Sequence, residues 1–358
     1  MESILKKSKA VCILGMHRSG TSTITRAVNL LGAYLGKDSD LMPPGLPNPE
    51  GYWERQDIMD LDDEIVHHFK RLWGTGNPLP KGWHLLEEVR PYRNKITALI
   101  KTHFSGHDMW AWKDPRTSVV FELWRDVLKE LGIDPVCLIA VRNPLDVVRS
   151  LEKRDGFPRD RGYGIWFHYN IAALKASAGL RRVFVSYDRF LDDWEGELKR
   201  CADGLGIEWP EDASLLRDKM KGFIRPNLRH SHSGVEDLLS SGAPEPVVRL
   251  YRLLESVTEP SLQPDPGFNE KIDALEKEFS SYARFYNDDL MRLWALEGLL
   301  IEKEGLLAEK ERQLSEKDNL LAEKERQLVE KDRNIQALLG SVSWKVTAPL
   351  RSVFKHLK

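Results

Sequence analysis

The stretch from Val11 to Ser22 constrains the fold more than any other part of this 358-residue chain. Four apolar residues, Val11 to Leu14, are typical of a buried strand. A loop framed by Gly15 and Gly20 follows, and Thr23 to Leu31 has the spacing of an amphipathic helix. In this order the loop amides and the positive end of the helix dipole point at the same place, so the pattern predicts a phosphate site.

The loop has the glycine spacing of a Walker A motif but lacks its lysine. Thr21 stands where the lysine follows the second glycine, and the nearest cation is Arg18, inside the loop. Kinases and ATPases rely on that lysine and a magnesium ion to bind a triphosphate and neutralise its charge. The loop therefore predicts a different phosphate ligand.

A second strand-to-helix junction lies between Pro135 and Ser150. The continuous apolar run from Pro135 to Val141 is typical of a parallel strand covered on both faces. Pro144 breaks the strand, and a new helix begins there. Arg142 at the strand's carboxyl end and Ser150, two turns into the helix, can present a guanidinium and a hydroxyl to a second phosphate.

Together the two junctions resemble the donor-binding motifs of the sulfotransferase family. There the first loop binds the 5′-phosphosulfate of 3′-phosphoadenosine 5′-phosphosulfate (PAPS), and an arginine and a serine at the second spacing bind its 3′-phosphate. The resemblance implies an α/β fold, a P-loop-type parallel sheet flanked by helices; the heptad pattern described below adds a long C-terminal α-helical coiled coil. It assigns the donor to Arg18, Ser19, Gly20, Thr21, Ser22, Arg142 and Ser150.

Two later segments resemble further parts of the family. Residues 182–193 read as a strand and a helix and are similar to its Tyr-Glu-Asp-Leu element, which would place Tyr187 near the adenine. A strand-end aromatic in the core is the alternative. The basic loop 225–233 lies where the family often has a late donor-binding segment, but it lacks the usual Gly-Lys-rich pattern. We therefore expect Arg225 and Arg229 to belong to a solvated loop.

Sulfonate transfer needs a base that takes the proton of the acceptor's hydroxyl and cations that hold the departing phosphate. Residues 48–54 resemble the Asn-Pro-x-Gly-Tyr-x-Glu element of bacterial sulfotransferases. In several branches the base is a glutamate in this part of the chain, so we expect Glu54 to be the base, with Glu50 as the second candidate. A capping or surface role near the helix from Asp57 to Phe69 is the alternative.

His103 is a competitor for the same role. Its Lys-Thr-His-Phe segment matches the letters of the cytosolic branch, where the histidine of Lys-Thr-His-Leu is the base. In that branch the motif ends a strand, whereas His103 follows the helix-like run from Val89 to Ile100. We therefore expect His103 to play no catalytic part.

The strand expected at Met109 to Trp112 ends in Lys-Asp-Pro-Arg, an element that recurs in the bacterial branch at the mouth of the donor site. The resemblance implies that Lys113 steadies the transferring sulfonate and that Arg116 lies at the rim. An ion pair between Asp114 and a neighbouring cation is the alternative.

Tryptophans crowd the region between the donor motifs. Sugar rings stack on exposed indole faces, so these residues favour a glycan acceptor, although many tryptophans are simply core. The residues are Trp53, Trp73, Trp83, Trp110 and Trp112.

Amino-acid composition limits the partners and the cellular location that we expect for this protein. The 53 Lys and Arg nearly balance the 55 Asp and Glu, which argues against nucleic acid as a partner. The three cysteines show neither a disulfide framework nor zinc spacing. Because a sulfonate carries less charge than a phosphate, cationic side chains can suffice for its transfer, and no metal is expected. The first strand begins within about ten residues, and no run approaches the ~20 apolar residues of a membrane span. We expect a bacterial, cytoplasmic protein, at most peripheral on the inner membrane surface.

The C-terminal third differs from the rest. After a Pro-rich linker at 261–267, residues 268–339 are highly charged and helical in pattern. Residues 306–319 are nearly repeated at 320–333, which predicts a left-handed coiled coil and a homodimer. A single solvated helix is the alternative. The apolar residues that recur every seven positions are Leu293, Leu300, Leu307, Leu314, Leu321, Leu328 and Ile335.

The tail at 340–358 resembles one found on bacterial enzymes that build surface polysaccharides. Its apolar residues Leu350, Val353, Phe354 and Leu357 would line one face of a short amphipathic helix, and Lys345, Arg351, Lys355 and Lys358 would supply positive charge. This helix could lie on an anionic membrane, on the chain's own catalytic domain or on a partner glycosyltransferase.

The sequence as a whole predicts a sulfotransferase domain at residues 8–260 that moves a sulfonate from PAPS to a hydroxyl of a glycan or lipid-linked sugar of the cell surface. Two alternatives remain open. One is a P-loop nucleotide kinase or NTPase, which should need magnesium and the missing lysine. The other is a catalytically silent scaffold for glycan-assembly enzymes.

Overall fold

The computed structural model describes residues 8–45, 48, 51–133, 135–224, 232–259, 267–283, 288–349 and 351, with backbone only at 281–283, 288–294 and 297. Several predictions fall outside the described residues. They concern Glu50, Arg225, Arg229, the linker apart from Gly267, the side chain of Leu293, and the tail residues Leu350, Val353, Phe354, Lys355, Leu357 and Lys358.

Four parallel strands form the sheet of the described chain, in the order β2-β1-β3-β4. Strand β1 lies between β2 and β3, and Val11 is in register with Ala111 on one side and Val136 on the other. All seven residues of β3 are buried. The predicted parallel sheet flanked by helices is therefore confirmed. The strands are β1 (Lys9–Leu14), β2 (Met109–Trp112), β3 (Pro135–Val141) and β4 (Arg182–Ser186).

Alternate strand residues enter two separate cores, as the two-residue period of a strand requires. Cys12 and Ile139 enter the larger core, and Val11 and Leu138 enter the smaller one. The larger core is covered by α3 (Gln56–His68), α4 (Arg90–Leu99), α5 (Thr117–Glu130), α6 (Pro144–Asp155), α7 (Arg159–Ala176), α11 (Val235–Ser240), α12 (Glu245–Thr258) and α13 (Phe268–Ala283). The smaller core is covered by α2 (Thr21–Leu30), α8 (Tyr187–Asp192), α9 (Trp194–Leu205) and α10 (Ser214–Phe223). Short helical turns are η1 (Asp38–Asp40), η2 (Trp83–Leu85), η3 (Glu87–Val89) and the π-helical η4 (Ile100–Phe104).

Three of the five tryptophans expected near the acceptor belong to the larger core. Trp110 and Trp112 point to the same side of β2, with ring centroids 5.2 Å apart, and Trp83 is equally buried. For these three the structure shows the core alternative. Trp110 and Trp112 belong to a strand of a sheet covered on both faces, and Trp83 of η2 packs edge-to-face against Phe69, with ring centroids 5.7 Å apart. Trp53 and Trp73 remain partly exposed.

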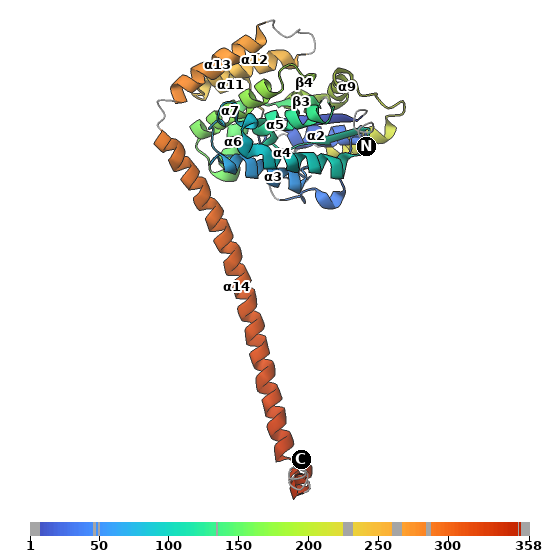
Figure 1. Cartoon of the computed structure of the whole chain (residues 1–358), viewed down its shortest axis with the longest axis vertical. Coiled ribbons are helices and arrows are strands. Elements are labelled where there is room, and N and C mark those ends of the chain that lie inside the picture. Colours follow the sequence, from blue (N-terminus) through green and yellow to red (C-terminus); the bar gives the residue numbers. More distant parts are fainter. Residues whose placement is uncertain are drawn as a thin grey trace. The chain divides into compact units, whose positions relative to one another are not determined.

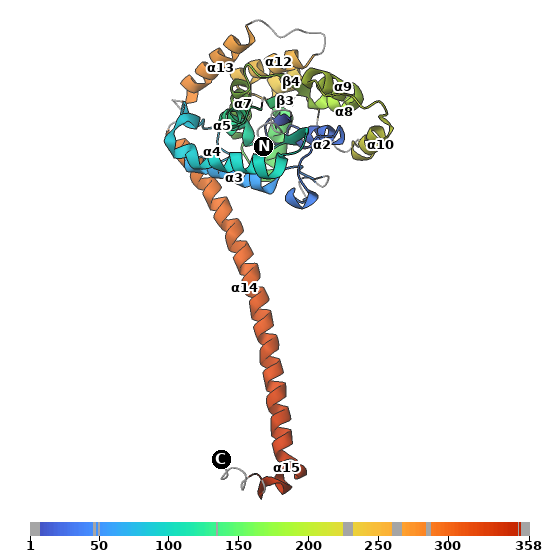
Figure 2. The same ribbon diagram turned by 45° about the vertical axis from the view of Figure 1, so that its right-hand side comes forward.

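Helix α13 packs on the α/β domain. Phe268, Ile272 and Leu275 are buried, and the ring of Phe279 stacks on Phe167 with centroids 4.2 Å apart. Figures 1 and 2 show α12 and α13 side by side, with α12 next to β4. The chain divides into compact units at Met1–Ala295 and Leu296–Lys358, so the domain extends beyond the predicted boundary at residue 260.

Helices α14 (Asp288–Gly340) and α15 (Val342–Val346) are the last two helices of the described chain (Figure 2). The hydroxyl of Ser341 caps α15 by accepting a hydrogen bond from the backbone N–H of Trp344, at 3.2 Å. The guanidinium of Arg351 lies 3.7 Å from the centroid of the Trp344 ring. None of the helices in the described ranges is both long and apolar enough to cross a bilayer.

A buried carboxyl joins α3 to α5. Asp62 is fully buried and accepts hydrogen bonds from the hydroxyl of Thr117 and from Nε1 of Trp124, the latter at 2.7 Å. Burial, and then the nearby charge of Asp114, raise the pKa of Asp62 above its usual value. The folded state therefore retains a proton at this carboxyl after the unfolded chain has lost it.

This proton makes stability depend on pH. As pH rises from about 4 through the raised pKa of Asp62, the unfolding free energy should fall by at most ~1.4 kcal/mol per pH unit. Asp62→Asn cannot ionise, so its stability should fall less between pH 5 and pH 8, as measured by urea unfolding. Asp60→Asn, at an exposed position of the same helix, should follow the wild type. Equal slopes in all three proteins would contradict the assignment.

Candidate donor-binding site

The loop from Gly15 to Gly20 joins β1 to α2, and Ser118 of α5 holds the first residue of the loop. The hydroxyl of Ser118 accepts a hydrogen bond from the N–H of Gly15 at 2.9 Å and donates to its carbonyl at 3.2 Å. Gly20 is the N-cap of α2 and has the left-handed conformation, with a φ of 83°. Glycine provides no capping side chain there, so the first amides of α2 can serve an anionic ligand.

The two predicted phosphate motifs meet at Arg18. Its Nε donates to the hydroxyl of Ser150 at 2.8 Å, and its carbonyl accepts a hydrogen bond from Arg142 at 2.7 Å. Among the described residues, no hydrogen-bond partner reaches the buried Nε of Arg142. Residues far apart in the sequence thus form one cationic site, with a donor available for an anion.

Tyr187 forms a wall of this site. Its ring lies beneath the guanidinium of Arg142, 4.7 Å from ring centroid to Cζ, and the residue is 5 % exposed. The ring also packs on Gly20, where an added methyl carbon would lie 2.0 Å from Cδ2 of Tyr187. The tyrosine is therefore both a packed aromatic and a neighbour of the predicted donor residues.

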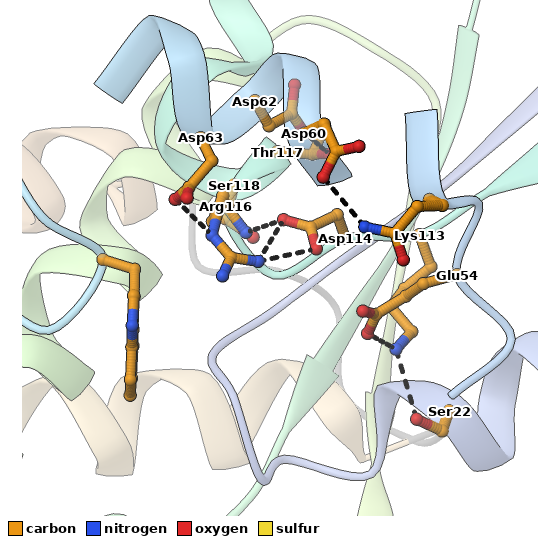
Figure 3. Close-up of polar contacts among 12 residues, drawn as sticks. Ser22, Glu54, Asp60, Asp62, Asp63, Lys113, Asp114, Arg116, Thr117 and Ser118 are labelled. Atoms are coloured by element: carbon orange, nitrogen blue, oxygen red, sulfur yellow. Dashed lines mark hydrogen bonds and ion pairs between the residues drawn. The ribbon is translucent and has the colours of Figure 1, made fainter. Parts of the chain in front are cut away.

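The predicted catalytic pair is a buried ion pair at the start of α2. Lys113 donates to the carboxylate of Glu54 and also to the hydroxyl of Ser22, at 3.2 Å (Figure 3). Asn48 donates to the same hydroxyl at 3.2 Å. Lys113 and Glu54 are 2 % and 7 % exposed, so each charge depends on the other for compensation. Trp53, with a left-handed φ of 57°, directly precedes Glu54.

Arg116 is held by two carboxylates. Its Nε lies 2.8 Å from Asp63, and its Nη1 lies 3.1 Å from Asp114, as Figure 3 shows. For Arg116 the structure therefore shows the ion-pair alternative. Asp114 also accepts from the backbone N–H of Arg116 at 2.7 Å, which fixes the turn between β2 and α5.

His103 lies in η4, beyond α4. Its Nε2 is 3.5 Å from a carboxylate oxygen of Asp57, near the start of α3. Asp57 is also paired with Arg55, 2.6 Å away. The histidine is thus engaged with this half-buried ion pair and takes no part in the contacts between Lys113, Glu54 and Ser22.

His17 is a residue of the loop that the sequence did not single out. Its ring lies between Trp73 and Tyr169, with centroid distances of 4.6 and 5.6 Å. Burial first, and then the surrounding arginines and Lys113, hold the pKa of His17 well below its usual value. Its buried Nε2 has no hydrogen-bond partner among the described residues. Its place inside the predicted phosphate loop was the one available signal.

Ser233 is anchored beside Arg142. Its hydroxyl donates to Asp146 at 2.7 Å, and its carbonyl accepts from Asn143 at 2.7 Å. Arg149 donates to the same hydroxyl at 3.0 Å. The end of the predicted basic loop is therefore fixed to the first turn of α6, a contact that the sequence did not reveal.

Comparisons with known proteins gave structural similarities only. No protein family matches the sequence, and no curated protein does. The sulfotransferase domain of the olefin synthase of Synechococcus PCC 7002 is 19% identical, with a TM-score of 0.37, over 75% of this chain and 94% of that domain. The sulfotransferase domain of the curacin biosynthetic pathway is 13% identical, with a TM-score of 0.33, over 76% and 98%. At this level the similarities do not decide the function, which has to come from the residues of the site.

The described residues contain no group of three or more His, Cys, Asp or Glu placed to hold a metal ion.

The contact between Gly20 and Tyr187 can be tested with a matched pair of glycines. Gly20→Ala and Gly82→Ala both place alanine at a positive φ, of 83° and 72°, at a cost of about 1 kcal/mol each. Only the first also collides with a ring, since Gly82 has open space around it. Gly20→Ala should lose about 1–3 kcal/mol more in urea unfolding. Equal losses would show that Tyr187 does not constrain the loop.

Proposed function

We propose that this protein is a sulfotransferase that moves a sulfonate from PAPS to a hydroxyl of a glycan or lipid-linked sugar. The observation that carries the proposal is the meeting of Arg142, Arg18 and Ser150 at the start of α2. Two phosphate-binding motifs that converge in this way suit a ligand with phosphates at both ends of one nucleoside.

The residues fit such a donor. Arg18 and the amides of the loop and of α2 would hold the 5′-phosphosulfate, together with Ser19, Gly20, Thr21 and Ser22. Arg142, whose Nε is free to donate, and Ser150 would hold the 3′-phosphate. Tyr187 would lie at the nucleoside, since its ring already contacts both Gly20 and Arg142.

Lys113 and Glu54 would carry out the transfer. The acceptor's oxygen attacks sulfur, the bond from sulfur to the 5′-phosphate oxygen breaks, and its electron pair leaves with the phosphate. Glu54 takes the hydroxyl proton, and Lys113, which already donates to Ser22, shares its positive charge with the sulfonate. Arg116 is engaged by Asp63 and Asp114, so we assign it the role of positioning this turn.

A sugar acceptor is supported by Trp73. Its ring is partly exposed, contacts His17 of the loop and has the guanidinium of Arg154 5.3 Å above it. The carbonyl of Trp73 accepts from Tyr169 at 3.0 Å, which fixes the ring beside the loop. Phe157 also stacks on this ring, with centroids 5.5 Å apart, so a sugar would contact the part of Trp73 that stays exposed beside the loop.

Donor binding should be measured first. Calorimetric titration with 3′-phosphoadenosine 5′-phosphate should show tight binding, weakened about tenfold or more in Arg142→Ala and Ser150→Ala. Arg125→Ala should bind like the wild type, because that arginine donates to a backbone carbonyl at the far end of α7. Binding of ATP with magnesium instead would favour a kinase or NTPase. Binding of neither nucleotide would favour a scaffold.

The base can be tested by Glu54→Gln, which keeps the shape of the side chain and removes its charge. Turnover of PAPS with a panel of glycosides and lipid-linked sugars should fall by about 10²- to 10⁴-fold, without weaker nucleotide binding. Glu64→Gln breaks a Glu–Lys pair at the surface and should leave turnover unchanged. Unchanged turnover in Glu54→Gln would rule out this residue as the base.

A further inference from the structure

Helix α14 carries an uncovered apolar column, which we call the leucine seam. Its members recur every seven residues, and each is more than half exposed in the single chain. They are Leu300, Leu307, Leu314, Leu321, Leu328 and Ile335, with exposures of 57, 58, 61, 58, 67 and 52%. A seven-residue apolar period on a helix this long is typical of packing against another helix.

The seam has charges of opposite sign on its two sides. The third residue after each of the first five seam positions is a lysine, and the fourth is an acid. Positions i+3 and i+4 lie on opposite sides of position i on a helix. One flank is therefore a lysine column and the other an acidic column. The lysine column is Lys303, Lys310, Lys317, Lys324 and Lys331. The acidic column is Glu304, Glu311, Asp318, Glu325 and Asp332.

These ten charges have no opposite charge within reach on their own helix. Lys317, for example, has Gln313, Leu314, Leu320 and Leu321 at the positions three and four residues away. The acidic column likewise has only apolar or uncharged residues at those spacings, such as alanine, serine and leucine. Ion pairs at those spacings lie on the opposite side of the helix, such as Arg312–Glu309 at 2.8 Å, and the two columns provide none of them.

We propose that a second copy of this chain packs on the leucine seam, parallel and in register. In a parallel pair, the two-fold axis places the lysine column of each helix against the acidic column of the other. In an antiparallel pair, lysines would face lysines and acids would face acids, which is repulsive. The charge pattern therefore selects both the partner and its direction.

The proposal goes beyond the proposed function and does not depend on it. In a parallel pair the residues that follow Gly340 in both copies emerge at the same end of the coiled coil. The pair therefore presents two basic tails together, whatever surface they contact.

The first test measures assembly of the full-length chain by sedimentation velocity at micromolar concentration. The wild type should have twice the mass of one chain. The triple variant Lys310→Glu, Lys317→Glu, Lys324→Glu makes both flanks acidic and should raise the dimer dissociation constant about tenfold or more. The matched control, Arg312→Glu, Arg326→Glu, Arg333→Glu, makes the same charge change on the opposite side of the helix and should remain a dimer.

A rescue separates electrostatics from misfolding. Mixing the lysine triple variant with the variant Glu311→Lys, Asp318→Lys, Glu325→Lys should restore a dimer, because acidic flanks then face basic ones. A monomeric wild type, equal loss of assembly in the control, or no rescue would each overturn the proposal.

Direction is tested by oxidative cross-linking of the full chain, whose native cysteines are all buried. In a parallel pair Leu307→Cys and Leu328→Cys should each form a disulfide-linked dimer alone. In a fully overlapped antiparallel pair only a mixture of the two variants would cross-link, and that result would overturn the parallel arrangement.

Discussion

The parallel pairing of β1 between β2 and β3 is the constraint on which the site depends. Parallel strands end at the same edge of a sheet, and the chain leaves each of these three strands with a segment of the proposed site. The loop at 15–20 follows β1, Lys113 follows β2, and Arg142 follows β3. The hydrogen bond from Arg142 to the carbonyl of Arg18 and the bond from Lys113 to Ser22 are possible because the register is fixed.

Much of this arrangement could be predicted because buried parallel strands leave a strong signal. The bounds expected for β2 and β3, 109–112 and 135–141, are those of the structure. Motif spacing then placed Arg18 in the loop after β1, Arg142 at the end of β3 and Ser150 two turns into the helix that follows. It could not show that Arg18 itself reaches Ser150, because that contact depends on side-chain direction and on the pairing of β1 with β3.

The features that the sequence did not predict also have physical causes. Helix α13 is rich in charge, so its apolar face at Phe268, Ile272 and Leu275 was grouped with the solvated helix that follows. The role of each tryptophan depends on which side of β2 or which loop it occupies, and composition does not encode that. The engagement of Arg116 by Asp63 could not be foreseen, since α3 and β2 are distant in sequence.

The cations of the site are already held before any ligand arrives. Arg18 donates a hydrogen bond to Ser150. Arg142 donates to the carbonyl of Arg18 and lies over the ring of Tyr187. Lys113 donates to Glu54 and Ser22. Fixing a free arginine or lysine side chain costs up to about 2 kcal/mol of conformational entropy. Because these contacts fix the side chains when the chain folds, most of this entropy is lost before an anion binds. More of the electrostatic attraction between the anion and these cations then appears as net binding affinity.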